Sequence, residues 1–212
     1  MSREAVLNRV RSALSRSKPE PVAPIVSYRR TGMLTGEQQV QLFESRLDDY
    51  GARVFHSSGQ NLRECIATIL LEGNKLRIVH PQGIPSAWLD QRISWAADSQ
   101  NPSEELAYSR IEGFDGVLTA ATAAVAESGS IVLQHDPAEG RRALTLLPDY
   151  HLCVIHTHQI VETLPECFER LKESGTRPTT FISGPSATAD IEMTRIKGVH
   201  GPRFLDVILV AQ

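Results

Sequence analysis

The sequence predicts an α/β fold with a mainly parallel sheet and helices on both of its faces. The first observation is an alternation of helical and strand-like segments, which begins with a helix over 36–50, a strand over 52–56, a helix over 61–71 and a strand over 76–79. The second is composition: the chain has 212 residues, of which 41% are hydrophobic and 22% are charged. That length suits one domain with a large core.

The chain starts with an amphipathic helix. Over Ser2–Arg16 the apolar residues recur at helical spacing, and Ser2 is placed to cap the first turn. Prolines 19, 21 and 24 follow and predict a semi-rigid linker to about Gly32. We therefore divide the chain into an arm and linker, residues 1–32, and an α/β domain, residues 33–212. The arm could dock on its own domain or join subunits in a homo-oligomer.

The remaining elements follow from apolar runs and their boundaries. Gly51 suits the left-handed position after the 36–50 helix, and Ser57 or Ser58 could cap the helix over 61–71. Asn101-Pro102 indicates the start of a helix, because asparagine caps helices and proline fits their first turn. Further helices are expected at 86–91, 101–110, 143–147 and 159–172, the last of them either interrupted or started by Pro165. Further strands are expected at 93–97, 114–119, 131–133, 151–155, 179–183 and 204–210.

Charge and composition exclude several classes of protein. A net charge of -3 argues against nucleic-acid binding, which usually needs a basic face. No apolar run approaches the roughly 20 residues of a membrane span, and residues 1–11 lack the apolar core of a signal peptide. The three cysteines are far apart and form no C-x-x-C, so we expect no cluster in this chain and a reducing, cytoplasmic location. His156-Thr157-His158 lacks supporting acidic residues, and we expect no metal site.

One long polar segment, 181–201, is the first candidate for a functional surface. It starts as a strand, breaks at Gly184-Pro185 and then carries closely spaced hydroxyls and carboxylates. Its amides and hydroxyls could bind substrate or another anion, although no lysine follows as in a P-loop. A helical turn capped by Thr188 or Asp190 would explain only part of the pattern. The candidate binding residues are Ser183, Gly184, Ser186, Thr188, Asp190, Glu192 and His200.

A second candidate is the turn Glu127-Ser128-Gly129-Ser130, which follows an alanine-rich stretch. Glu127 could be a solvated charge, or a carboxylate held at a strand end, where α/β sheets build their sites. Farther along, Arg141 and Arg142 could bind an anion or simply cover a helix face. The sequence leaves these alternatives open.

Four segments together resemble the LUD-domain family, and in particular its lactate utilization protein C members. They are A-A-V-A-E-S-G-S-I-V-L at 123–133, the passage from Arg142 to His151, I-S-G-P-S-A-T-A-D-I-E at 182–192 and G-V-H-G-P at 198–202. The resemblance extends from about residue 36 to residue 212. Ala187 departs from the pattern, since many relatives carry a basic residue there.

The resemblance implies a fold and a role. The fold is a three-layer α/β/α sandwich related to the NagB/RpiA/CoA-transferase group. The role is that of a component in a cytoplasmic system that oxidises L-lactate to pyruvate with iron–sulfur partner subunits. The clusters would lie in those partners, and a small organic acid could bind to this chain. The resemblance assigns this component no catalytic mechanism.

Two other functions remain open. The chain could be a stand-alone enzyme of the CoA-transferase or cyclo-ligase type, with Glu127 as catalytic nucleophile or base and Ser183, Gly184 and Ser186 binding a phosphate or acyl oxygen. It could also be a small-molecule-binding scaffold protein that uses its N-terminal arm as the contact element.

Overall fold

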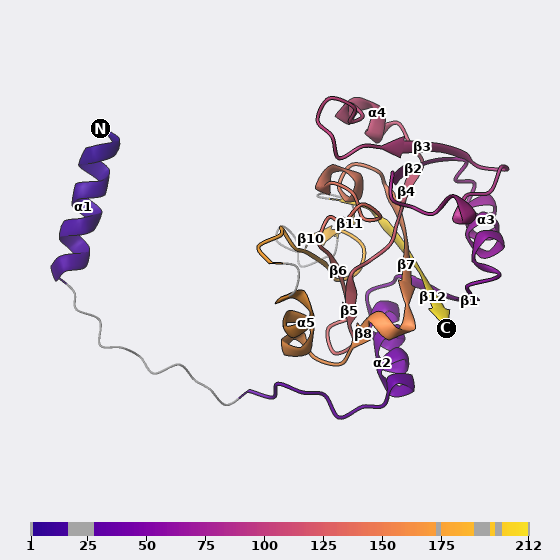
Figure 1. Ribbon diagram of the computed structural model, residues 1–212, viewed down its shortest axis with the longest axis horizontal. Helices are drawn as coiled ribbons and strands as arrows, with labels where there is room; N and C mark the ends of the chain where they lie inside the picture. The colour runs from indigo at the N-terminus through magenta and orange to yellow at the C-terminus, as the bar shows by residue number, and fades with distance from the viewer. Residues whose placement is uncertain (1, 17–27, 173–174, 189–195, 198–200, 212) are drawn as a thin grey trace.

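A six-stranded parallel sheet forms the centre of the domain (Figure 1). The computed structural model describes residues 2–16, 28–172, 175–188, 196–197 and 201–211. The strand order is β1-β12-β7-β4-β2-β3, and every neighbouring pair is parallel. The strands are β1 (Arg53–Ser58), β2 (Arg77–Pro81), β3 (Ser94–Asp98), β4 (Gly116–Thr119), β7 (Tyr150–His156) and β12 (Phe204–Ala211). The predicted α/β class and mainly parallel sheet are confirmed.

Successive side chains of the central strands enter two different cores. In β7, Leu152 and Val154 pack with α3 (Leu62–Glu72), near the short helix η1 (Ser86–Trp88). Cys153 and Ile155 point to the opposite face, where they pack with α2 (Gly36–Asp49). This alternation follows from the two-residue period of a strand. Both faces of the sheet are therefore buried, which explains the continuous apolar runs of β7 and β12.

A second sheet lies on the α2 face and was not predicted. Its order is β8-β5-β6-β9, and it includes antiparallel pairs. Its strands are β5 (Ala123–Val125), β6 (Ser130–Leu133), β8 (Ile160–Val161) and β9 (Thr180–Ile182). One side packs against α2 and the central sheet, and the other is covered by α5 (Leu164–Leu171). The alanine-rich stretch is thus a strand buried on both sides.

The prediction that residues 159–163 belong to a helix over 159–172 is wrong, whereas its alternative, a helix started by Pro165, is confirmed. Residues 157–159 form the 3₁₀ turn η3 (Thr157–Gln159), and Ile160 and Val161 belong to β8. The α-helix starts only at Leu164 because Thr163 closes a capping box: its Oγ1 accepts from Glu166 N, and Glu166 Oε2 accepts from Thr163 N at 2.9 Å. Ile160 and Val161 therefore occupy strand positions rather than helical ones.

The prediction of a helix from Asn101 is also wrong. Asn101 Oδ1 accepts from Ser103 N and Oγ, which folds the segment into a turn. The helix in this region is the short α4 (Tyr108–Glu112). It packs through Ile111 against β4 and the 3₁₀ helix η2 (Arg142–Thr145). Neither Ser57 nor Ser58 caps α3, because both lie in β1 and Asn61 holds the N-cap position.

The helices at the start of the chain agree with their patterns. α1 (Arg3–Arg16) begins after Ser2, whose Oγ accepts from Ala5 N, and its apolar side chains are exposed. α2 is capped by Thr35, and Gly51 follows it with the predicted left-handed φ of 76°. Among the described residues, no helix is both long and apolar enough to cross a membrane.

Residues just before α2 are attached to the domain. The backbone N–H groups of Met33 and Leu34 donate to Glu162 Oε2 at 2.5 and 2.6 Å, and Gly32 N donates to Glu166 Oε1 at 2.7 Å. Arg29 pairs with the buried Glu162 carboxylate at 2.7 Å. Contacts with the α/β domain therefore extend back at least to Arg29. A last two-stranded ribbon, β10 (Ala187–Thr188) with β11 (Ile196–Lys197), lies in the polar segment between β9 and β12.

Candidate functional site

The two polar segments found in the sequence touch each other through a row of hydroxyls. Ser130 Oγ lies 2.8 Å from Ser128 Oγ and 2.7 Å from Ser183 Oγ. Antiparallel pairing of β6 with β9 places these residues together, since Ile131 is the register partner of Ile182. Tyr50 supports both segments: its hydroxyl donates to Ser128 O at 3.3 Å, and its side chain packs against Gly184.

Glu127 lies at the solvent side of this row. Its side chain is 47% exposed and pairs with Arg29, while Arg46 Nε donates to its backbone oxygen at 3.2 Å. A nucleophilic carboxylate would need burial beside a substrate-sized cleft. These contacts do not favour the predicted catalytic role of Glu127, which stays a prediction.

A pocket of about 250 Å³ lies behind the Ser183 loop. It opens between η2, the first residues of β7 and β12, and the segments on either side of the β10–β11 ribbon. It therefore lies at the amino ends of these parallel strands, whereas ligands of α/β sheets usually bind at the carboxyl ends. Its lining residues are Arg142, Thr145, His151, Phe181, Ile182, Ser183, Gly184, Pro185, Ser186, Gly201, Pro202 and Leu205.

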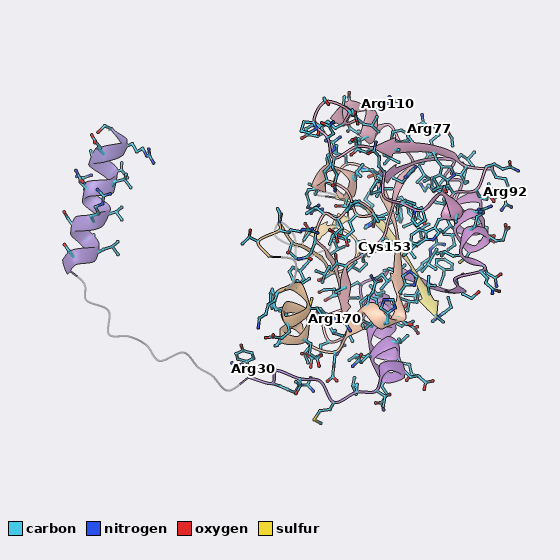
Figure 2. The ribbon with its side chains drawn as sticks, viewed as in Figure 1. Arg30, Arg77, Arg92, Arg110, Cys153 and Arg170 are labelled. Atoms are coloured by element: carbon cyan, nitrogen blue, oxygen red, sulfur yellow. The ribbon has the colours of Figure 1, made fainter. Side chains whose placement is uncertain are left out.

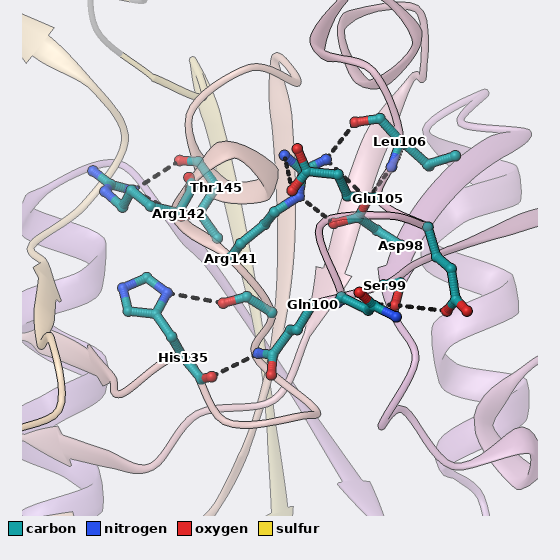
Figure 3. A network of polar contacts seen from close by, with 12 residues as sticks. Asp98, Ser99, Gln100, Glu105, Leu106, His135, Arg141, Arg142 and Thr145 are labelled. Atoms are coloured by element: carbon teal, nitrogen blue, oxygen red, sulfur yellow. Dashed lines mark hydrogen bonds and ion pairs between the residues drawn. The ribbon is translucent and has the colours of Figure 1, made fainter.

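The two adjacent arginines have different roles (Figure 3). Arg141 makes a bidentate pair with the buried Asp98, with Nε–Oδ2 2.7 Å and Nη2–Oδ1 3.0 Å. It also donates to Leu106 O and pairs with Glu105 at 3.4 Å. Among the described residues, Arg142 donates only to the hydroxyl and carbonyl of Thr145, at 2.7 and 3.3 Å, and forms no ion pair. Arg141 is thus structural, whereas Arg142 offers its charge to the pocket.

Partial burial of Arg142 has an electrostatic consequence. Desolvation lowers the pKa of its guanidinium, yet an arginine stays protonated at any physiological pH. A cation that has lost part of its hydration and has no described carboxylate partner attracts an anion strongly. This property distinguishes Arg142 from the surface arginines, such as Arg77 and Arg92, which pair with Asp115 and with Asp90 and Glu64 respectively (Figure 2).

His151 is the most deeply buried polar side chain of the pocket, with 1% of its surface exposed. Its Nε2 lies 2.8 Å from Thr119 Oγ1. Burial first, and then the charge of Arg142, lower the pKa of His151 to about 3. The imidazole is therefore neutral at neutral pH, which keeps Arg142 as the pocket's single positive charge among the described lining residues.

Lowering the pH should destabilise the protein through His151. An unfolded histidine titrates near pH 6.5, whereas the folded ring resists protonation down to about pH 3. Between these values the unfolded state binds more protons, so stability falls with pH by up to about 1.4 kcal/mol per unit. Denaturant unfolding at pH 7 and pH 5 of the natural protein and of His151→Asn measures this. The acid loss should be smaller in the variant, and equal losses would contradict the assignment.

Three of the sequence-predicted site residues line the pocket, namely Ser183, Gly184 and Ser186. Thr188 lies in β10, opposite Ile196 of β11. Asp190, Glu192 and His200 lie outside the described residues. Anion binding by Arg142 was one of two alternatives left open by the sequence, and His151 was not predicted as a site residue. The two residues are the first and last of the passage from Arg142 to His151 that resembles the LUD-domain family. This was the only feature of the sequence that linked them.

Comparisons with known proteins agree with this architecture. A family model described as LUD domain matches residues 40–210. The chain is 40% identical over 97% of its length to a Deinococcus radiodurans protein named lactate utilization protein C, and covers 93% of that protein. It is 26% identical to lactate utilization protein C 1 of Bacillus mycoides, with 99% and 97% of the two chains covered. A crystal structure of a DUF162 family protein from D. radiodurans has a TM-score of 0.72 and 38% identity, covering 84% of this chain and 99% of that one.

Proposed function

The chain belongs to the LUD-domain family, and from this premise we propose that it is a component of a cytoplasmic system that oxidises L-lactate to pyruvate. The observation that carries the proposal is the 40% identity with a lactate utilization protein C, over nearly the whole length of both chains. The region of similarity spans nearly the whole of both chains, so it includes the residues that line the pocket. A pocket with one desolvated arginine and no described acidic lining residue suits the anion of a small organic acid.

We assign the iron–sulfur clusters of this system to partner subunits. The three cysteines of this chain occupy separate places: Cys65 packs beside the α3 core, Cys153 lies in the core beneath α2, and Cys167 packs under α5. One cluster needs several thiolates at one point, and these side chains do not converge. The free thiols also suit a reducing compartment.

Deleting the gene should abolish or strongly slow growth on L-lactate as sole carbon source and leave growth on glucose unchanged. Tagged protein from lactate-grown cells should also recover partners that carry iron–sulfur absorbance. Expression of the natural chain in the deletion strain serves as the control and should restore growth. Undiminished growth on L-lactate would contradict the proposed function.

The N-terminal arm is proposed to join subunits. Val6, Leu7, Val10 and Leu14 are 40–67% exposed, which leaves an apolar helix face uncovered. Four arginines and one glutamate give α1 a charge of +3, so the rest of the chain carries -6 and attracts it. Removing residues 1–27 retains Arg29 and its contacts, and should convert an oligomer into a monomer in analytical ultracentrifugation. Unchanged assembly would remove this role.

A further inference from the structure

Two polar side chains of the pocket behind Ser183 could each bind a ligand, one through its charge and the other through a ring nitrogen. Arg142 has a desolvated guanidinium with no acidic partner among the described residues. His151, almost fully buried, uses Nε2 for Thr119, and its Nδ1 has no partner in the part of the chain that the structure describes. Both line the same cavity. A ring nitrogen that lines the cavity without a described partner, beside a guanidinium with no described acidic partner, indicates a ligand that supplies both a negative charge and a polar group.

The hydrogen bond behind His151 limits the polar groups that its free nitrogen can bind. Thr119 Oγ1 lies 2.8 Å from Nε2 and 3.7 Å from Cys153 Sγ, so the hydroxyl can donate to Nε2 or accept from it. The tautomer of the ring then makes Nδ1 a donor or an acceptor. A ligand hydroxyl bonds to either form, because it both donates and accepts, whereas a ligand carbonyl bonds only to a protonated Nδ1.

The size and remaining walls of the pocket limit the ligand further. A volume of about 250 Å³ is below the roughly 300–1,000 Å³ of typical drug-sized sites. One arginine matches a monocarboxylate, whereas phosphate sites usually combine several cations or a helix N-terminus. Apolar side chains, Ile182, Pro185, Pro202 and Leu205 among them, can receive a short hydrocarbon group.

We infer that this pocket binds a small 2-hydroxy monocarboxylate, with the carboxylate on Arg142 and the hydroxyl hydrogen-bonded to His151 Nδ1. The inference deepens the proposed function and rests on it for the identity of the acid, which would be L-lactate. The hydroxyl row Ser128–Ser130–Ser183 holds the loop that closes one side of the pocket. No covalent step is assigned to the pocket, and His151 acts here only as a hydrogen-bonding partner of the ligand.

Isothermal titration of the purified full chain tests the assignment with four probes: sodium L-lactate, sodium pyruvate, L-lactamide and inorganic phosphate. L-lactate should bind saturably and at least about tenfold more tightly than pyruvate, which lacks the hydroxyl. L-lactamide keeps the shape without the charge and should not bind measurably. Tighter binding of phosphate or pyruvate than of L-lactate would overturn the ligand class, and absence of L-lactate binding would overturn the site.

Variants locate the binding. Arg142→Gln should weaken L-lactate binding at least about tenfold, because a charge-assisted bidentate contact is lost. Arg142→Lys keeps the positive charge but cannot make two parallel hydrogen bonds to a carboxylate, so it should weaken L-lactate binding by an intermediate amount. The matched control is Arg203→Gln. Arg203 is next to Pro202, which lines the pocket, but its guanidinium already pairs with the exposed Asp149. This variant should change binding less than twofold, and equal effects of the two glutamine variants would overturn the assignment.

Failure of this inference can be told apart from failure of the proposed function. Growth of the deletion strain on L-lactate measures the function of the chain, and titration of the purified protein measures the pocket. If deletion stops growth and the chain expressed with Arg142→Gln restores it fully, the function stands and the pocket assignment falls. Circular dichroism of each variant verifies folding, and if Arg142→Gln does not fold, Arg142→Lys, with its intermediate loss of binding, provides the comparison.

Discussion

Replacing Asp98 with asparagine should destabilise the protein by about 3–5 kcal/mol, the usual cost of leaving a buried charge without its partner. The Asp98 side chain is 1% exposed and that of Arg141 is 16% exposed. Asp98 also accepts from Leu106 N at 2.8 Å, so the same carboxylate fixes the turn before α4. An asparagine would keep one acceptor oxygen, lose the charge and place an N–H₂ group against the guanidinium.

Urea unfolding at neutral pH measures this effect. The matched control is Asp149→Asn, which removes the same charge from the exposed pair with Arg203 and should cost less than about 1 kcal/mol. Since Arg141 begins the turn that carries Arg142, the Asp98 variant should also weaken L-lactate binding. Equal stability losses in the two variants would contradict the structural role of the Asp98–Arg141 pair.

Replacing Gly184 with alanine should have the second-largest effect, because two costs add. Gly184 has a φ of 83°, which costs a residue with a side chain about 1–2 kcal/mol. A Cβ there would lie 2.5 Å from Tyr50 Cβ, and overpacking of this kind costs a further 1–3 kcal/mol or so. The loop would have to move away from α2, which would separate Ser183 from Ser130 and open one side of the pocket.

Gly175→Ala separates the two costs. Gly175 also has a left-handed φ, 68°, but no atom of the described residues lies within 4 Å of the Cβ that would be added. It should lose only the strain of about 1–2 kcal/mol, with L-lactate binding unchanged. Gly184→Ala should lose clearly more stability and weaken binding as well. If both variants lose the same amount in urea unfolding, packing against Tyr50 does not hold the loop.

The strands of the central sheet could be predicted from the sequence, whereas the second sheet could not. Long apolar runs such as β7 and β12 are buried on both faces, so their pattern is independent of the neighbouring strand. β8 has two residues, and β5 consists of two alanines and a valine, so neither has the length or composition that identifies a strand. Their conformation is set by pairing with β6 and by the cores beneath α2 and α5, which are tertiary effects.

The candidate site divides in the same way. Ser183, Gly184 and Ser186 could be selected because unusual local sequence marks a loop. Arg142 and Arg141 are adjacent and chemically identical in the sequence, and only Asp98, more than forty residues earlier, assigns one of them to structure. His151 sits at the start of a buried strand, where a histidine is usually a core residue. Its unused nitrogen can be recognised only beside the cavity.

The position of β12 has a consequence for biosynthesis. β1 is an edge strand whose only partner in the central sheet is β12, and Arg53 pairs with Asp206, 153 residues later. During translation β1 must therefore wait, unpaired, until almost the whole domain has emerged from the ribosome. Contacts so distant along the chain slow folding and prolong the exposure of apolar strands. The apolar strands of the nascent protein are therefore open to aggregation until β12 is available to pair with both β1 and β7.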